Sequence, residues 1–195
     1  MNDAWARNEN DVAMKKALRR GSYDTLNIYF QTDLQPDPSG NSPAGRSSSS
    51  DGEPVANLLG FCTLPNPEIT AVSRPIDYVE DGCNVLAASM PGGPIPHYSL
   101  GGTAVHEVGH WHGLLHTFQG ETCDPGNDGD YIADTPIQSI PTDGCPAVKD
   151  SCPKDPGLDL IHNFMDYSSD DCYQNFTPNQ AKRMRDMWYI MRMGK

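Results

Sequence analysis

One stretch of eleven residues constrains this chain more than any other: His106-Glu-Val-Gly-His-Trp-His-Gly-Leu-Leu-His116. Residues four apart lie on one face of an α-helix, so His106 and His110 can direct two imidazoles at a single metal ion. Glu107 lies beside them and is suited to act as a general base rather than as a ligand. The stretch therefore predicts a helix that carries a metal site.

The third histidine requires this helix to end before it. On an unbroken helix, six residues at roughly 100° each would rotate His116 by about 600° from His110, away from the ion. Gly113 can adopt left-handed backbone angles at little cost, so we expect the chain to bend there and bring His116 back. Three neutral imidazoles leave a tetrahedral zinc ion with one open position for water, which is typical of a catalytic site.

Two alternatives accompany this interpretation. A zinc ion that only stabilises the fold would not need an acid beside its ligands, so Glu107 favours catalysis. His112 is two residues from His110 and faces away when His110 faces the metal, so we interpret it as a packing or surface residue.

Charge and hydropathy argue against two classes of protein. The 195 residues carry 14 Lys and Arg against 26 Asp and Glu, a net charge of −12. This argues against a nucleic-acid partner, because neutralising phosphates needs a basic face. No stretch approaches the ~20 consecutive apolar residues of a membrane span, which excludes an integral membrane protein. At roughly 100–200 residues per domain, residues 1–195 are expected to form one domain.

The six cysteines indicate a cellular compartment. An even number in a loop-rich, acidic chain favours disulfides and an oxidising, extracellular environment. Six buried free thiols in a cytosolic protein are the alternative. The first residues contain no apolar segment of the kind that marks a secretory signal peptide, so we expect none in this sequence.

Local patterns predict a small number of helices and strands. Thr177 and Pro178 are a suitable N-cap and first residue for a C-terminal helix. Residues 34–54 are rich in Ser, Pro and Gly and predict a flexible surface loop. The expected helices cover residues 10–20 and 178–191, and the expected strands cover residues 25–30, 58–64 and 84–89.

The histidine motif resembles that of the metzincin superfamily of zinc endopeptidases. More closely, the chain is similar to the pappalysin family, in particular its secreted fungal and bacterial members. The similarity covers most of the chain from residue 10 onward. The segments that carry it are Leu59-Gly-Phe-Cys-Thr-Leu-Pro65, residues 102–118, Asp130-Tyr-Ile-Ala-Asp-Thr-Pro136, Ile161-His-Asn-Phe-Met-Asp-Tyr-Ser168 and Phe176-Thr-Pro-Asn-Gln180.

This resemblance implies an α+β fold, a metzincin-like zincin catalytic domain. A small twisted sheet and the zinc helix would form an upper lobe, about residues 1–113. An irregular lower lobe, about residues 114–195, would end in the C-terminal helix. Metzincin domains normally begin with a strand and a long helix, and this chain starts near the end of that helix, so we expect the N-terminal strand and most of the helix to be truncated. An extended substrate would add to an edge strand, for which residues 84–89 are the candidate.

The resemblance also implies roles for three residues of the C-terminal half. Met165 would form the Met-turn beneath the zinc, with an ordinary core methionine as the alternative. Tyr167 would hydrogen-bond the tetrahedral intermediate, with a core tyrosine as the alternative. Asp170 would lie at the base of the S1′ pocket and pair with Arg or Lys of the substrate, although the adjacent Asp171 is a second candidate.

Disulfides and a calcium site are implied in the same way. The pairs are Cys123–Cys152 and Cys145–Cys172, which leaves Cys62 to pair with Cys83; spacing alone would not decide among the pairings. Asp124, Asp130 and Asp134 are candidate ligands for a structural calcium ion, with a solvated acidic loop as the alternative.

The sequence thus predicts a secreted zinc-dependent endopeptidase acting on proteins or peptides. Glu107 is the expected general base, and Arg or Lys is the expected preference at P1′. One alternative is a catalytically impaired, truncated metzincin that serves as a zinc-containing binding module. Another is a disulfide-linked secreted protein with an accidental motif.

Overall fold

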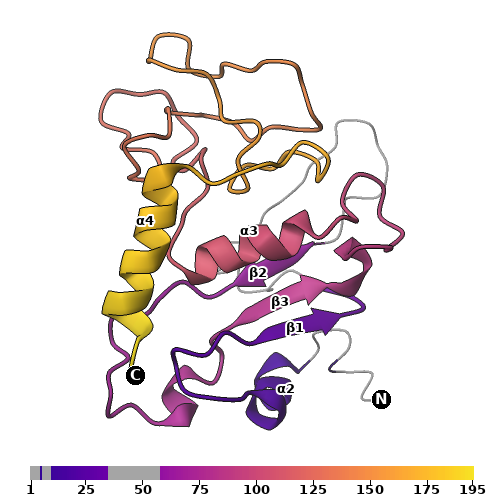
Figure 1. Ribbon diagram of the computed structural model, residues 1–195, viewed down its shortest axis with the longest axis vertical. Helices are drawn as coiled ribbons and strands as arrows, with labels where there is room; N and C mark the ends of the chain where they lie inside the picture. The colour runs from indigo at the N-terminus through magenta and orange to yellow at the C-terminus, as the bar shows by residue number, and fades with distance from the viewer. Residues whose placement is uncertain (1–4, 6–9, 35–57) are drawn as a thin grey trace.

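The computed structural model describes residue 5, residues 10–34 and residues 58–195. The loop predicted over residues 34–54 lies outside the described residues, apart from Leu34. Figure 1 shows a small sheet with helices on both of its faces and a long irregular segment between the last two helices. The elements are α2 (Asp11–Leu18), β1 (Ile28–Gln31), β2 (Gly60–Cys62), β3 (Cys83–Leu86), α3 (Gly102–Trp111), α4 (Pro178–Met187), two 3-10 turns (Pro75–Tyr78 and Ala87–Ser89) and a π-helical turn (Trp188–Arg192).

The three strands form a mixed sheet in the order β1-β3-β2. β1 is parallel to β3, with Ile28 opposite Cys83, and β2 is antiparallel to it, with Cys62 opposite Cys83. The prediction that residues 84–89 form the substrate-binding edge is therefore wrong. All four residues of β3 are buried, because β3 has a neighbouring strand on each side and its polar Asn84 finds side-chain partners. The edge beside α3 is β2.

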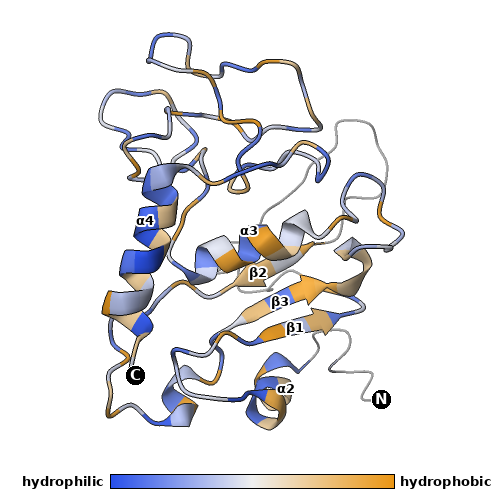
Figure 2. Ribbon diagram, viewed as in Figure 1, coloured by the Kyte–Doolittle hydropathy of each residue, from blue (hydrophilic) through white to orange (hydrophobic). Residues whose placement is uncertain are grey.

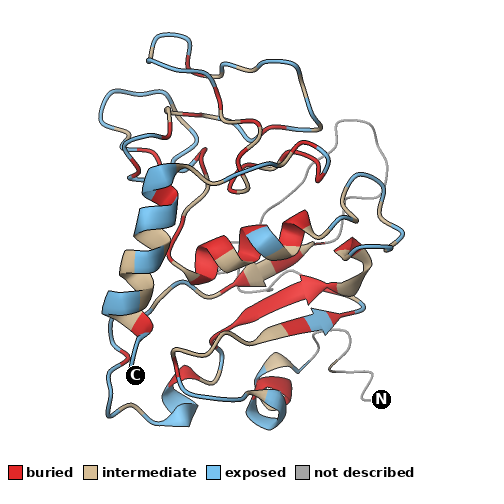
Figure 3. Cartoon of the chain, in the orientation of Figure 1, coloured by how far each residue is buried: buried red, intermediate tan, exposed pale blue. Residues whose placement is uncertain are grey.

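Alternate side chains of the sheet meet different helices, as the pleat of a strand requires. On one face, Cys83 and Val85 are completely buried in a cluster with Trp111 of α3. On the other face, Asn84 donates a 2.7 Å hydrogen bond to Asp11 at the start of α2. Figure 2 shows the apolar character of the strands, and Figure 3 shows that β3 and much of α3 are buried. The helix α3 therefore packs against buried apolar side chains of the sheet.

The predicted elements exist, although several are shorter than expected. The first helix starts at Asp11 because Asn10 caps it by accepting a hydrogen bond from the Ala13 amide. The strand predicted from residue 25 begins only at Ile28, because the side chain of Asn27 hydrogen-bonds both the amide and the carbonyl of Arg20. These local hydrogen bonds hold the backbone in turns instead of in the sheet.

The chain between α3 and α4 is irregular and cross-linked. Residues 112–177, all of which the structure describes, contain one isolated β-bridge, Asn163 to Asn175, and no longer element. Two of the three disulfides join distant parts of this segment, and the third links β2 to β3. The pairs are Cys62–Cys83, Cys123–Cys152 and Cys145–Cys172, as the family resemblance implies. The division of the chain into two lobes stays a prediction.

The C-terminal segment returns to the sheet and α3. Arg192 is completely buried, and its guanidinium lies 3.7 Å from the ring centroid of Trp111. It donates hydrogen bonds to the Trp111 carbonyl at 3.0 Å and to the Asp81 carboxylate at 2.9 Å. The end of α3 is thereby tied to the loop before β3. Within the described ranges, no helix has the length and apolarity needed to cross a membrane.

Candidate metal centre

The helix α3 is capped at its start by a residue far away in the sequence. Its N-cap, Gly101, has no side chain to do this. Asp170 supplies the acceptor instead: its Oδ2 accepts hydrogen bonds from the amides of Leu100 at 2.7 Å and Gly102 at 3.2 Å. A carboxylate at a helix N-terminus also interacts favourably with the helix dipole.

At its other end, α3 stops in a Schellman turn, which confirms the predicted bend. Gly113 has a φ of +86°. Its amide donates to the His110 carbonyl at 2.8 Å, and the Leu114 amide donates to the Gly109 carbonyl at 3.0 Å. This is the hydrogen-bond pattern of the motif, and glycine is favoured at its left-handed position. The turn reverses the chain within a few residues and sends it back toward His116.

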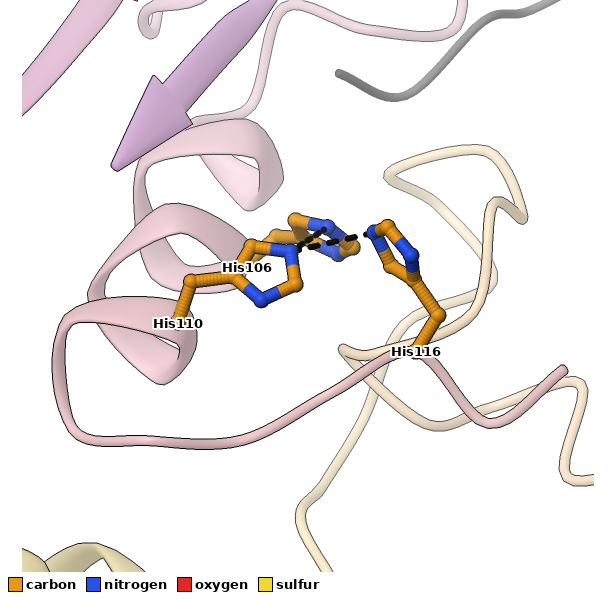
Figure 4. A group of neighbouring side chains, drawn as sticks. All are labelled: His106, His110 and His116. Atoms are coloured by element: carbon orange, nitrogen blue, oxygen red, sulfur yellow. Dashed lines mark hydrogen bonds between the residues drawn. The ribbon is translucent and has the colours of Figure 1, made fainter. Parts of the chain in front are cut away.

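The three imidazoles converge, as Figure 4 shows. The Nε2 atom of His110 lies 3.1 Å from that of His106 and 3.0 Å from that of His116. A tetrahedral ion bound at about 2.0–2.1 Å would separate its ligand nitrogens by roughly 3.3 Å, so the trio fits zinc. His106 and His110 direct their Nδ1 atoms at the carbonyls of Phe164 and Leu114, at 2.6 and 2.8 Å. These bonds leave the Nε2 lone pairs free for a metal.

Burial keeps the three rings neutral. It is the main cause that lowers the pKa of His106 to about 3, and the neighbouring His110 lowers it further. Burial also lowers the pKa of His110, and it lowers that of His116 to well below its ordinary value. Neutral imidazole is the form that binds metals, so the three histidines can bind an ion without first losing protons.

Glu107 of α3 is buried, with 5 % of the residue exposed. Among the described residues, its Oε2 atom has no hydrogen-bond partner. Burial raises the pKa of this carboxyl to about 8. The edge strand comes close to it: a Cβ added at Gly60 of β2 would lie 2.7 Å from Glu107 Cγ and 2.9 Å from Oε1. An unpaired acid in such a place is typical of a functional site.

The segment around Met165 lies against the end of α3. Met165 is completely buried in a cluster with Leu114 and Ile132, and its carbonyl accepts a hydrogen bond from the Thr117 amide at 3.1 Å. Two residues later, the hydroxyl of Tyr167 lies 3.1 Å from His116 Nε2. Burial raises the pKa of Tyr167, so its hydroxyl keeps its proton. The structure thus brings Tyr167 to His106 and His116, and packs Met165 beside Gly109 of the same helix.

Asp170 and Asp171 differ in their surroundings. Asp171 is exposed. Asp170 is 7 % exposed, and its Oδ2 caps α3. Its Oδ1 is buried and has no hydrogen-bond partner in the part of the chain that the structure describes. Of the two predicted candidates for the S1′ pocket, only Asp170 is a buried carboxylate with an oxygen left to bind a cationic side chain.

The three calcium candidates do not form a group. Asp134 instead caps α4: its carboxylate accepts hydrogen bonds from the Thr177 hydroxyl at 2.7 Å and the Asn179 amide at 3.0 Å. Asp130 is buried and bonds Thr135, whereas Asp124 is exposed. Within the described ranges, the groups of three or more metal-binding side chains are the three histidines and the set of Cys145, His162 and Cys172, whose cysteines form a disulfide. The expectation of calcium at these three aspartates has no support here.

Some functional contacts have no signal in the sequence. The carbonyls of Phe164 and Leu114 act through the backbone, so no residue type marks them. Gly60 did carry a signal, because a glycine inside a strand pattern often marks a close backbone approach. His112, as expected, points away from the cluster, and its Nδ1 bonds the Val108 carbonyl at 2.9 Å.

Comparison with known proteins shows which family this site resembles. Residues 97–188 match the Peptidase_M43 family model, described as pregnancy-associated plasma protein-A. An extracellular metalloprotease of Aspergillus fumigatus is 64 % identical, and one of Aspergillus oryzae is 61 % identical. Each alignment covers 100 % of this chain but only 62 % of the relative, so the chain spans less than two thirds of these proteins.

A solved structure supports the same placement. Mature mirolysin of Tannerella forsythia, in complex with a cleaved peptide, has a TM-score of 0.63 and 26 % identity to this chain. The match covers 95 % of this chain and 64 % of mirolysin. The fold is therefore the α+β fold of a metzincin, and the family implies zinc as the metal. On its histidine site, its fold and its relatives, the chain is similar to the pappalysin family of metzincin metalloproteases, Peptidase_M43.

Proposed function

We propose that this chain carries the catalytic site of a secreted zinc endopeptidase that hydrolyses proteins or peptides. The observation that carries the proposal is the pairing of three neutral, convergent imidazoles with the buried, unpaired carboxylate of Glu107 on the same helix. The relatives named extracellular metalloproteases and the three disulfides support secretion.

Each part of the site has a chemical task. His106, His110 and His116 would hold the ion, which when bound supplies Lewis-acid polarisation and lowers the pKa of water. Glu107 takes a proton from the attacking water and later gives one to the leaving amine, and its raised pKa suits both transfers near neutral pH.

Tyr167 is placed to stabilise negative charge as it develops. Its hydroxyl lies 3.1 Å from His116 Nε2, whose lone pair is the only acceptor found for it among the described residues. Once that lone pair is used as a metal ligand, the hydroxyl proton is free to bond the carbonyl oxygen of the substrate. A donor preorganised in a partly buried site contributes more there than it would in water.

The experiment that tests the function combines metal analysis with hydrolysis of casein. We expect one zinc ion per chain and measurable cleavage. Glu107→Gln should keep the zinc but lower kcat by about 10³-fold or more, since general acid–base catalysis contributes typically 10²–10⁴-fold. His112→Asn is a matched control at the C-cap of the same helix and should keep both zinc and activity, whereas His110→Asn should lose both. Full zinc occupancy without cleavage by the wild type would instead indicate a binding module.

We further propose that Asp170 gives the enzyme a preference for Arg or Lys at P1′. Its buried, unpartnered Oδ1 is suited to a guanidinium or ammonium group, since charge-assisted hydrogen bonds are the stronger ones. Its second oxygen caps α3, so Asp170→Ala would also damage the metal-site helix.

The variant that separates these two roles is Asp170→Asn, which keeps an oxygen for the cap but loses the charge. We expect kcat/KM for peptides with P1′ Arg to fall about 100-fold, from a loss of about 2–3 kcal/mol, while peptides with a neutral P1′ residue change little. Sites would be mapped by mass spectrometry of a peptide library. Retention of a basic P1′ preference in Asp170→Asn would refute the assignment.

A further inference from the structure

The three histidines are held in place in different ways. His106 and His110 are on α3, and the Nδ1 of each is fixed by a backbone carbonyl. His116 follows the Schellman turn and lies outside any helix or strand. Among the described residues, its Nδ1 has no hydrogen-bond partner. Metal-binding histidines almost always have such a partner, which sets the direction of the ring. The protein therefore orients the His116 ring through a contact other than a hydrogen bond at Nδ1.

Phe118 makes that contact. Its ring is stacked on His116 with a centroid separation of 4.8 Å and an angle of 5° between the planes. The same ring meets Tyr167 edge-on, at 4.7 Å and 69°. Tyr167 in turn meets His116 at 4.9 Å and 74°. The three rings thus contact one another pairwise in geometries that aromatic groups prefer.

Phe118 is itself firmly placed. It is 4 % exposed. The amide of the preceding residue, Thr117, donates a hydrogen bond to the Met165 carbonyl. The carbonyl of Phe118 accepts a hydrogen bond from the Glu121 amide at 3.0 Å. Its backbone is therefore anchored on one side to the segment around Met165 and on the other to the turn that follows. A ring held in this way limits rotation of its neighbour.

We propose that Phe118 is a positioning residue that sets the ring direction of His116, and with it the hydroxyl of Tyr167, by stacking where the described residues offer Nδ1 no hydrogen bond. The inference rests on the proposed zinc-peptidase function. Phe118 would not touch the ion or the substrate. It would keep Nε2 of His116 directed at the other two ligand atoms and so reduce the loss of side-chain freedom when the ion binds.

The test measures zinc affinity by competition with a chelator, and the visible absorption of the Co²⁺-substituted protein. Loss of a group that orients a metal ligand typically costs about 10–100-fold in affinity. We expect Phe118→Leu to weaken zinc binding by that factor and to alter the Co²⁺ spectrum. Phe118→Trp keeps an aromatic face and should restore both to near the wild-type values.

Phe176→Leu is the matched control. Phe176 packs against the cluster of Leu114, Ile132 and Met165, and has no ring contact with the three histidines. This variant removes a ring of the same size from a half-buried position and should lower the melting temperature while leaving zinc affinity and the Co²⁺ spectrum unchanged. If Phe118→Leu does not fold, Phe118→Met fills the space without a ring and is measured instead. Unchanged affinity and spectrum in the folded ringless variant, or equal shifts in Phe176→Leu, would overturn the inference.

Both readouts can be taken in a Glu107→Gln background, which keeps the ligands but lacks the proposed base. Weaker zinc binding by Phe118→Leu in that background supports the inference independently of catalysis. A wild-type chain that binds zinc without cleaving peptides would contradict the proposed function and leave the role of Phe118 standing. A wild-type chain that binds no zinc would overturn both.

Discussion

At the scale of single residues, the space around the proposed general base is set by a glycine on another element. A methyl group at Gly60 would lie within 3.0 Å of three atoms of Glu107. We expect Gly60→Ala to displace the carboxylate and to lower kcat by about 10-fold or more, because a shift of 1 Å in a positioned group can cost about 100-fold. Zinc content should not change, since Gly60 lies against the acid and not against a ligand.

A double-mutant cycle separates this effect from any damage to the edge strand. Glu107→Asp shortens the acid and withdraws it from the added methyl group. Gly60→Ala should then cost less in the Glu107→Asp background than in the wild type, which is the coupling expected of residues in contact. Equal costs in kcat in the two backgrounds would show that Gly60 acts through the strand instead.

At the scale of elements, the N-terminus of α4 is fixed by an acid from the preceding loop. Asp134 bonds both the Thr177 hydroxyl and the Asn179 amide, while Thr177 and Gln180 form a capping box. We expect Asp134→Ala to lower the free energy of unfolding by about 1–2 kcal/mol, as the loss of a helix cap does. Asp124→Ala is the control, because Asp124 is exposed and its carboxylate caps none of the described helices.

The same pair of variants tests the calcium prediction for the loop of residues 123–136. Thermal unfolding would be followed with and without added Ca²⁺. If Asp134 serves only as a cap, the loss in Asp134→Ala is the same in both conditions. A calcium-dependent gain in melting temperature that both substitutions abolish would mean that the two carboxylates share an ion.

How far the elements could be predicted depended on where their determinants lie in the sequence. The histidine helix, its bend at Gly113 and the cap at Thr177 were predictable because spacing, a left-handed glycine and a capping residue act within one or two turns. The place of β3 at the centre of the sheet was not, because it depends on pairing with β1 and β2. The cap that Asp170 provides for α3 joins residues 68 apart, and no local pattern indicates it.

At the scale of the whole molecule, distant segments meet at the carboxylate of Asp81. It receives hydrogen bonds from Arg192 at the C-terminal end, from the Trp111 indole of α3 and from Thr63 after β2. Hydrophobic patterning alone did not predict this buried network. Because it ties the end of α3 to segments before and after it, metal binding and global stability should be coupled, as they are wherever an ion binds only the folded state.

In the metal-free protein, the pH dependence of stability should reveal this coupling, because the histidines that would bind the ion also bind protons. The pKa values of His106, His110 and His116 are lowered on folding, so below about pH 6.5 the unfolded chain binds protons that the folded chain does not. Stability then falls with decreasing pH, by about 1.4 kcal/mol per pH unit for each group. Glu107 has the opposite sign: its pKa is raised to about 8, so its contribution grows as the pH falls from 8 toward its ordinary value near 4.5.

The two opposing effects place a maximum in the stability of the metal-free protein near pH 6.5. Burial raises the pKa of Asp130 to about 6, so Asp130, like Glu107, favours the folded state as the pH falls. The three histidines have the opposite effect, and together they exceed the effect of these two acids. Urea unfolding of the EDTA-treated chain between pH 5 and 8 measures this curve. Glu107→Gln should abolish the decline between pH 6.5 and 8, and His116→Gln should flatten the decline below pH 6.5. A wild-type curve without a maximum would mean that these groups keep ordinary pKa values when no metal is bound.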